Sequence, residues 1–212
     1  MSKRKRFWSP RYGAYGLLPL LCLAVADGYG AGPAVRVGAL RFGTVNWELD
    51  VIDTHGLAAA RGVVIEVVAL ASNSATQVAL QGGAADVIVS DWIWVSRQRA
   101  AGHDYTFVPY SLAVGSLMVR PDAELQNLSD LEGKRLGVAG GPLDKSWLLL
   151  RAYTRHALGV DLAKLVEPNF AAPPLLNQLL LSGRLPAALT FWHYAAQLEA
   201  AHFDAAHKLL GR

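Results

Sequence analysis

Residues 128–138, Leu-Ser-Asp-Leu-Glu-Gly-Lys-Arg-Leu-Gly-Val, decide the fold class of this 212-residue chain. The polar side chains at the start of the stretch can cap one helical turn, and Gly133 can end that turn. The chain then enters a short β-type run, residues 134–138. A regular alternation of strands and helices restarts at this point.

The part of the chain before this stretch shows the same alternation. Residues 63–70, VVIEVVAL, are apolar and rich in β-branched side chains, as expected of a strand buried on both faces of a parallel sheet. The pattern predicts strands at residues 35–40, 63–70, 86–90, 106–110 and 115–120, and helices at residues 45–60, 75–81 and 91–100.

The part after it continues in the same way, with strands predicted at residues 134–138, 165–170 and 187–190, and helices at residues 145–158, 174–181 and 192–202. Repeated strand–helix–strand units predict an α/β fold with mixed, mostly parallel sheets flanked by helices. We expect two lobes, residues 34–115 and 116–212. The linker near residues 111–121 is the candidate hinge between them.

Three stretches carry a resemblance to a known family. The first comprises HGL at residues 55–57, RGV at residues 61–63 and IEVV at residues 65–68. The second is ALQGGAAD at residues 79–86, and the third is LSDLEGKRLGV at residues 128–138. In this order and spacing they resemble the periplasmic solute-binding proteins of ABC importers, in the nitrate, sulfonate and taurine family with its thiamine-precursor-like relatives. The resemblance runs from about residue 35 to residue 200.

The resemblance implies a two-lobed fold like that of type II periplasmic binding proteins. It also implies capture of a small solute in a cleft between the lobes, and ABC permease membrane subunits as partners of a monomeric protein. Chains of this family recross to complete lobe one. We therefore expect an incomplete second crossover without the return segment, that is, a C-terminally truncated form with apolar surface exposed on lobe one.

Residues 1–26 read as a cleavable signal peptide. Five basic residues precede the apolar run GLLPLLCLAVA at residues 16–26, which ends in the small-x-small pattern Ala24-Val25-Ala26. Eleven apolar residues are too few for a membrane-spanning helix. We therefore expect cleavage before Asp27, with Ala31 and Ala34 as alternative sites, and a periplasmic location.

Charge and cysteine content exclude several function classes. Without residues 1–26, the chain has 15 basic and 17 acidic side chains. The net positive charge of the full sequence therefore gives no reason to expect nucleic-acid binding. The single cysteine, Cys22, lies in the predicted signal, so we expect no disulfide and no thiol nucleophile. The six histidines are dispersed, and no metal or cofactor motif is present.

The candidate ligand contacts follow from one rule. In open α/β sheets ligands bind beyond the carboxyl ends of the strands, where helix N-termini present free N–H groups. The residues that follow the predicted strands, and that we expect to bind the ligand, are Thr44, Asn46, Trp47, Asn73, Ser74, Ser90, Asp91, Trp92, Gly140, Gly141, Lys145, Ser146 and Trp192.

Each of these residues also has an ordinary structural interpretation. Four of the six tryptophans fall just beyond strand ends, where they can wall a cleft or anchor a helix to its sheet. Ser74 and Ser146 can donate to an oxyanion or cap a helix. Asp91 would repel nitrate or a sulfonate and would suit an amine or a neutral heterocycle better.

Two other classes of function stay open. One is a pyrimidine-precursor synthase-like enzyme on the same fold, although the chain has no Gly-x-Ser-x-Gly elbow and no phosphate loop, and we expect no catalytic residues. The other is a truncated remnant that binds nothing.

Overall fold

The computed structural model describes residues 32–206. The predicted signal peptide at residues 1–26 lies outside the described residues, as does the end of lobe two beyond residue 206. Among the residues described, no helix combines the length and the apolar character needed to cross a membrane.

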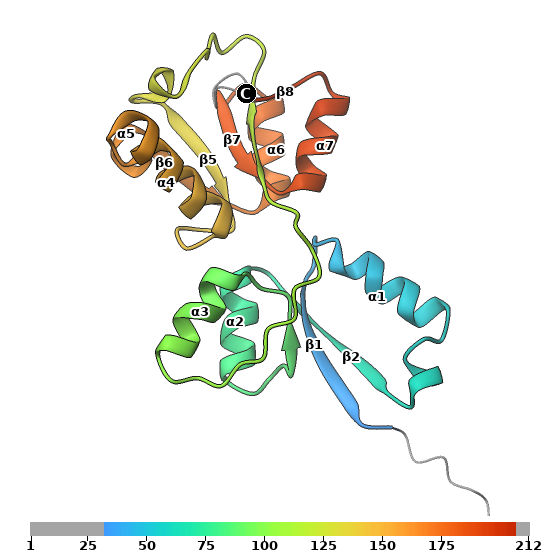
Figure 1. Ribbon diagram of the computed structural model, residues 1–212. Coiled ribbons are helices and arrows are strands. Elements are labelled where there is room, and N and C mark those ends of the chain that lie inside the picture. The colour runs from blue at the N-terminus through green and yellow to red at the C-terminus, as the bar shows by residue number, and fades with distance from the viewer. Residues whose placement is uncertain (1–31, 207–212) are drawn as a thin grey trace, which may run out of the picture. The chain divides into compact units, whose positions relative to one another are not determined.

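A three-stranded parallel sheet, here called the first sheet, has the strand order β2-β1-β3. The central strand pairs with β2 along its whole length, from Ala34 opposite Val64 to Leu40 opposite Leu70. Figure 1 shows α1 on one side of β1, with α2 and α3 on the other. The elements are β1 (Ala34–Leu40), α1 (Val45–Thr54), η1 (Ala59–Arg61), β2 (Val64–Leu70), α2 (Asn73–Gln81), β3 (Val87–Ile88) and α3 (Trp92–Ala100).

A five-stranded mixed sheet, here called the second sheet, has the order β6-β5-β7-β4-β8. β5 is parallel to β6 and β7, whereas β4 is antiparallel to β7 and β8. Pro168 lies in β6, at the edge of the sheet, where a missing N–H is tolerated. The elements are β4 (Ser116–Val119), η2 (Leu128–Leu131), β5 (Arg135–Ala139), α4 (Lys145–Leu158), α5 (Leu162–Leu165), β6 (Glu167–Ala171), α6 (Pro173–Leu181), β7 (Ala187–Thr190), α7 (Trp192–Ala200) and β8 (Asp204–Ala205).

The stretch that decided the fold class forms a capped turn, as predicted. The Asn127 side chain accepts a hydrogen bond from the Ser129 N–H, and the Asp130 carboxylate accepts one from the Asn127 N–H at 2.9 Å. Leu128 and Leu131 are thereby held in the core. Gly133 then takes a positive φ of 68°, and β5 begins two residues later.

Within residues 32–206, the two hydrophobic core clusters both belong to the second sheet. One face is covered by α4 and α5, which contribute Trp147, Leu150 and Leu162. The other is covered by α6 and α7, through side chains such as Leu176 and Leu198. Because β5 and β7 are buried on both faces, they can consist almost wholly of small and apolar residues.

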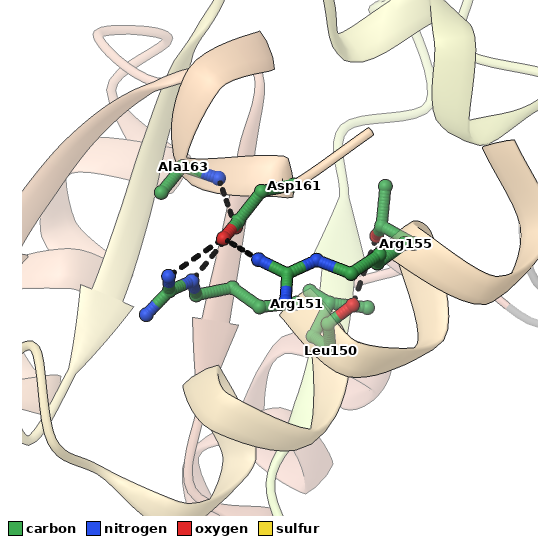
Figure 2. A network of polar contacts seen from close by, with 6 residues as sticks. Leu150, Arg151, Arg155, Asp161 and Ala163 are labelled. Atoms are coloured by element: carbon green, nitrogen blue, oxygen red, sulfur yellow. Dashed lines mark hydrogen bonds and ion pairs between the residues drawn. The ribbon is translucent and has the colours of Figure 1, made fainter. Parts of the chain in front are cut away.

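A charged network fixes the junction of α4 and α5 (Figure 2). Asp161 is 9% exposed and accepts hydrogen bonds from Arg151 Nε at 2.8 Å and Nη2 at 2.7 Å, and from Arg155. It also caps α5 through the Ala163 N–H. The arginines hold the pKa of the Asp161 carboxyl well below its usual range, the hydrogen bonds from Arg151 having the largest effect.

The first sheet is covered less completely. Val64, Val67 and Val87 on its strands are between 39% and 51% exposed, and Val78 on α2 is 65% exposed. A groove of about 560 Å³ runs between α1 and β2, with Ile52, Val64 and Val67 among the residues that line it. The expectation of exposed apolar surface in this half of the chain is therefore met.

The structure corrects two predicted elements. The helix predicted at residues 45–60 ends at Thr54, because the chain turns at Gly56 with a φ of 61° and then forms only the short helix η1. The strand predicted at residues 106–110 was wrong: residues 103–115 form no helix or strand and join no sheet. The apolar run there connects the last helix of the first sheet to β4.

Candidate ligand-binding site

A cavity of about 280 Å³ lies where carboxyl ends of strands from both sheets meet. The first sheet contributes the residues that follow β1 and β2, and the second contributes those that follow β5, β6 and β7. The lining residues are Leu40, Phe42, Ala71, Ser72, Asn73, Ser74, Gly140, Gly141, Phe170, Ala171, Ala172, Pro173 and Phe191.

One wall of the cavity is the first turn of α2. Ser72 caps this helix by accepting a hydrogen bond from the Ala75 N–H at 3.1 Å. Asn73 and Ser74 occupy the first two helical positions, whose N–H groups have no partner within the helix. The partial positive charge of a helix N-terminus therefore lies at this wall.

The facing wall contains the Gly140-Gly141 pair after β5, with φ values of 84° and 98°. A side chain on Gly140 would be strained by this φ, and its Cβ would come within 2.4 Å of Asp144 Oδ2. The pair therefore brings main chain directly to the cavity and holds the Asp144 carboxylate beside it.

Asp144 caps α4 by accepting a hydrogen bond from the Ser146 N–H at 2.8 Å. Burial, first of all, raises the pKa of Asp144, and the charge of Asp91 raises it further. Asp91 in turn caps α3, accepting from the Trp94 N–H at 2.8 Å. Two capping carboxylates, one from each half of the chain, thus lie near this end of the cavity, and the charge of Lys145 partly offsets them at Asp144.

The apolar part of the lining is dominated by phenylalanine. Phe42, Phe170 and Phe191 come from three different strand ends. None of the thirteen lining residues, all of which lie within the described part of the chain, carries a charged side chain. The site therefore combines apolar walls with a few main-chain and side-chain polar groups, as is usual for sites that bind small molecules.

Four of the residues predicted from the sequence line this cavity: Asn73, Ser74, Gly140 and Gly141. Leu40, Phe42, Phe170 and Phe191 line it as well and were not among the predicted contacts. Each of these lies at the end of a strand or directly after one. The strand-end rule could therefore have found them, had it not been restricted to polar residues, glycine and tryptophan.

Two predicted contacts are engaged with the linker. The Lys145 ammonium donates to the carbonyl oxygen of Ala113 at 3.1 Å, and the Ser146 hydroxyl accepts from the Gly115 N–H at 3.0 Å. Gly115 has no room for a Cβ, which would lie 2.6 Å from the carbonyl oxygen of Thr190. These contacts tie the start of α4 to the first half of the predicted hinge.

Other predicted contacts lie at the turns that follow the strands. Thr44 precedes α1 without a side-chain capping bond. Asn46 donates to the carbonyl oxygens of Leu40 and Gly43, closing the turn after β1. The hydroxyl oxygen of Ser90 is buried and has no hydrogen-bond partner among the residues described.

The tryptophans divide into two groups. Trp147 is 2% exposed and belongs to the core of the second sheet. Trp92 is 55% exposed. Trp47 and Trp192 are 61% and 45% exposed and meet edge to face at 6.3 Å.

Asp86, which ends the second family-like stretch, has a structural role. Arg36 binds its carboxylate through the main-chain N–H at 2.8 Å and through the guanidinium, joining β1 to the start of β3. The hydrogen bonds from the Arg36 side chain, above all, lower the pKa of Asp86 to about 2. No group of three or more metal-ligating side chains occurs within residues 32–206.

The arrangement of two α/β halves with a cavity at their strand ends is that of type II periplasmic binding proteins, as solved structures show. The alkanesulfonate-binding protein SsuA from Xanthomonas axonopodis pv. citri, bound to MOPS, matches 81% of this chain and 59% of its own, with 20% identity and a TM-score of 0.64. The periplasmic aliphatic sulphonate binding protein SsuA from Escherichia coli matches 79% and 57%, with 23% identity and a TM-score of 0.58. An ancestral arginine-binding protein bound to arginine matches 83% and 76%, with 21% identity and a TM-score of 0.54.

The family model described as NMT1/THI5 like matches residues 52–201, and the chain belongs to that family. The resemblance read from the three stretches is therefore confirmed. These three solved structures are of binding proteins. The chain spans less than two thirds of the length of either sulfonate-binding protein. No curated protein sequence matches it.

Proposed function

We propose that this chain is the extracytoplasmic solute-binding component of an ABC-type importer. It captures a small organic solute or anion of the sulfonate, nitrate or taurine type and delivers it to the permease membrane subunits. The observation that carries the proposal is the cavity at which carboxyl ends of strands from both sheets meet. The predicted signal peptide supports a periplasmic location.

The electrostatics of the site favour a zwitterion within this range of solutes. The N-terminus of α2 suits an oxyanion such as a sulfonate. The carboxylate of Asp144, beside Gly140, suits an ammonium group at the opposite wall. A short aminosulfonate such as taurine presents both charges, and the phenylalanine side chains accommodate its methylene groups.

Thermal unfolding of the purified chain with taurine and with ethanesulfonate tests the proposal. The two compounds differ only in the amine, so the pair isolates the contribution of the Asp144 carboxylate. A ligand at a hundredfold excess over Kd stabilises the folded state by about 2.7 kcal/mol, which raises the Tm of a chain of this size by roughly 5–11 °C. We expect taurine to give the larger shift. If neither compound nor nitrate moves the Tm, the proposal is wrong.

Substitution assigns the effect to the cavity. Ser74→Ala removes a hydroxyl from the first turn of α2, whereas Ser96→Ala makes the same change on an exposed face of α3, away from the cavity. We expect Ser74→Ala to weaken taurine binding severalfold and Ser96→Ala to leave it unchanged. Equal affinities in the two variants would place the solute elsewhere.

A further inference from the structure

His193 contacts two residues that line the cavity and bridges the two halves of the chain. Its Nε2 lies 3.3 Å from the carbonyl oxygen of Phe42, which follows β1 of the first sheet. His193 itself belongs to α7 of the second sheet, and its ring is 6.3 Å from that of Phe191. Because Phe42 and Phe191 both line the cavity, the histidine joins two of its walls.

Trp47 on α1 adds an aromatic contact at the same place. Its ring meets His193 at 6.0 Å and Trp192 at 6.3 Å, in both cases edge to face. Trp192 and His193 are themselves 5.5 Å apart. Here α1 contacts α7 through aromatic side chains. Together with the hydrogen bond from His193 to Phe42, this contact forms one interface between the two halves of the chain.

The hydrogen bond fixes the tautomer of the neutral imidazole, and the burial of the other ring nitrogen opposes a second proton. A carbonyl oxygen only accepts, so Nε2 carries the proton and Nδ1 carries the lone pair. Nδ1 is buried and has no hydrogen-bond partner among the described residues. A second proton would therefore sit on a buried nitrogen with no acceptor, which is costly.

The surroundings of His193 offer no charge that would offset this cost. Arg41 precedes Phe42, and Glu48 follows Trp47. The charge of Glu48 acts on Tyr110, just before the linker: burial raises the pKa of Tyr110, and the charge of Glu48 raises it further. Tyr194 is the neighbouring ring on α7, and burial raises its pKa. The acidic groups of α1 are Glu48, Asp50 and Asp53; α6 has none. Burial lowers the pKa of His193, the Phe42 carbonyl opposes this, and no charged side chain contributes.

We propose that His193 is a pH-sensitive latch on the cavity: the neutral imidazole holds the Phe42 and Phe191 walls together, and protonation releases them. The proposal rests on the proposed function for its effect on solute affinity. When the halves separate, His193 is exposed to water and its pKa returns toward 6.5. The separated form then binds the proton more tightly, so the latched form loses stability as the pH falls below about 6.5.

The first experiment needs no ligand. Subtracting the tryptophan fluorescence of the Trp47→Phe variant from that of the wild type isolates the emission of Trp47, whose ring contacts His193. Between pH 7.5 and pH 5.0 we expect this difference signal to change with an apparent pKa below 6.5. In His193→Gln, which keeps an N–H donor but does not titrate, it stays constant. His156→Gln, an exposed site on α4, titrates like the wild type. An unchanging wild-type signal, or an equal change in His193→Gln, overturns the latch.

The second experiment uses taurine and compares the Kd of the wild type with that of His193→Gln at each pH. The contribution of Asp144 is common to both proteins and cancels in this ratio. We expect the ratio to rise by up to about tenfold per pH unit of acidification, the limit set by uptake of one proton. A constant ratio overturns the coupling between latch and cavity. Absence of taurine binding at pH 7.5 counts against the proposed function instead, and the ligand-free titration then decides the latch.

Discussion

Replacing Asp161 tests how the second sheet keeps α4 and α5 together. Asp161→Asn keeps an oxygen that can cap α5 but removes the charge that binds Arg151 and Arg155. Asp161→Ala removes the cap as well. Because asparagine and aspartate are equally good N-cap residues, the difference between the two variants isolates the cap, and the asparagine variant isolates the ion pair.

The structure indicates how much each substitution should lower the free energy of unfolding. Arg155 is largely exposed and contributes little, whereas Arg151 binds the buried carboxylate through two nitrogens. Loss of that pair should lower the free energy of unfolding by about 1–2 kcal/mol, since a hydrogen-bonded arginine is left with a neutral partner. Loss of the cap should cost about 1 kcal/mol more.

Urea and thermal unfolding at pH 7 measure both steps. For a chain of this size each kcal/mol corresponds to roughly 2–4 °C in Tm. Glu132→Gln serves as the control, because within residues 32–206 the Glu132 side chain makes no hydrogen bond or ion pair and is exposed.

The dependence on pH has a definite sign. The folded pKa of Asp161 is lowered, so its stabilising contribution is fully present above the unfolded value near 3.8 and is lost as the pH falls toward the folded value. The difference between the wild type and Asp161→Asn should therefore shrink below about pH 4. If Asp161→Asn unfolds within 0.5 kcal/mol of the wild type at pH 7, roughly the scatter for neutral surface substitutions, the network does not stabilise the fold as we argue.

Three further predictions concern the site and its supports. Gly140→Ala should lower the free energy of unfolding by about 1–3 kcal/mol and abolish the taurine-induced rise in Tm, because its φ of 84° and the nearby Asp144 carboxylate exclude a Cβ; a variant with wild-type stability and binding would contradict the geometry. Ser146→Ala should cost about 1 kcal/mol and speed hydrogen exchange at the Gly115 amide, which loses its acceptor; unchanged exchange would mean that the bond is absent in solution. Arg36→Met should return the pKa of Asp86 from about 2 toward 3.8, measured by NMR titration of the carboxyl carbon; an unshifted titration would show that Arg36 is not its partner.

The sequence determined the fold class because its decisive signals are local. A capping residue, a buried leucine pair and a glycine with positive φ interact over a few residues, so residues 127–138 carry a local signal for their own structure. Apolar runs at strand spacing, such as residues 63–70, likewise identify strands, but the prediction that this strand is buried on both faces was wrong, because β2 lies at the edge of the first sheet. The same reasoning failed at residues 106–110, because an apolar run becomes a strand only where a sheet edge is free to pair with it.

The tertiary structure alone decided which strand-end residues share a site. Asn73 and Gly140 are far apart in sequence and meet only because the carboxyl ends of strands from the two sheets face one cavity. Lys145 and Ser146 satisfy the same strand-end rule, yet they bind the linker, because α4 begins next to its path. His193 was one dispersed histidine among six in the sequence. Only packing gives it a carbonyl partner 151 residues away and leaves its second nitrogen buried, since burial and long-range contact are properties of the folded chain.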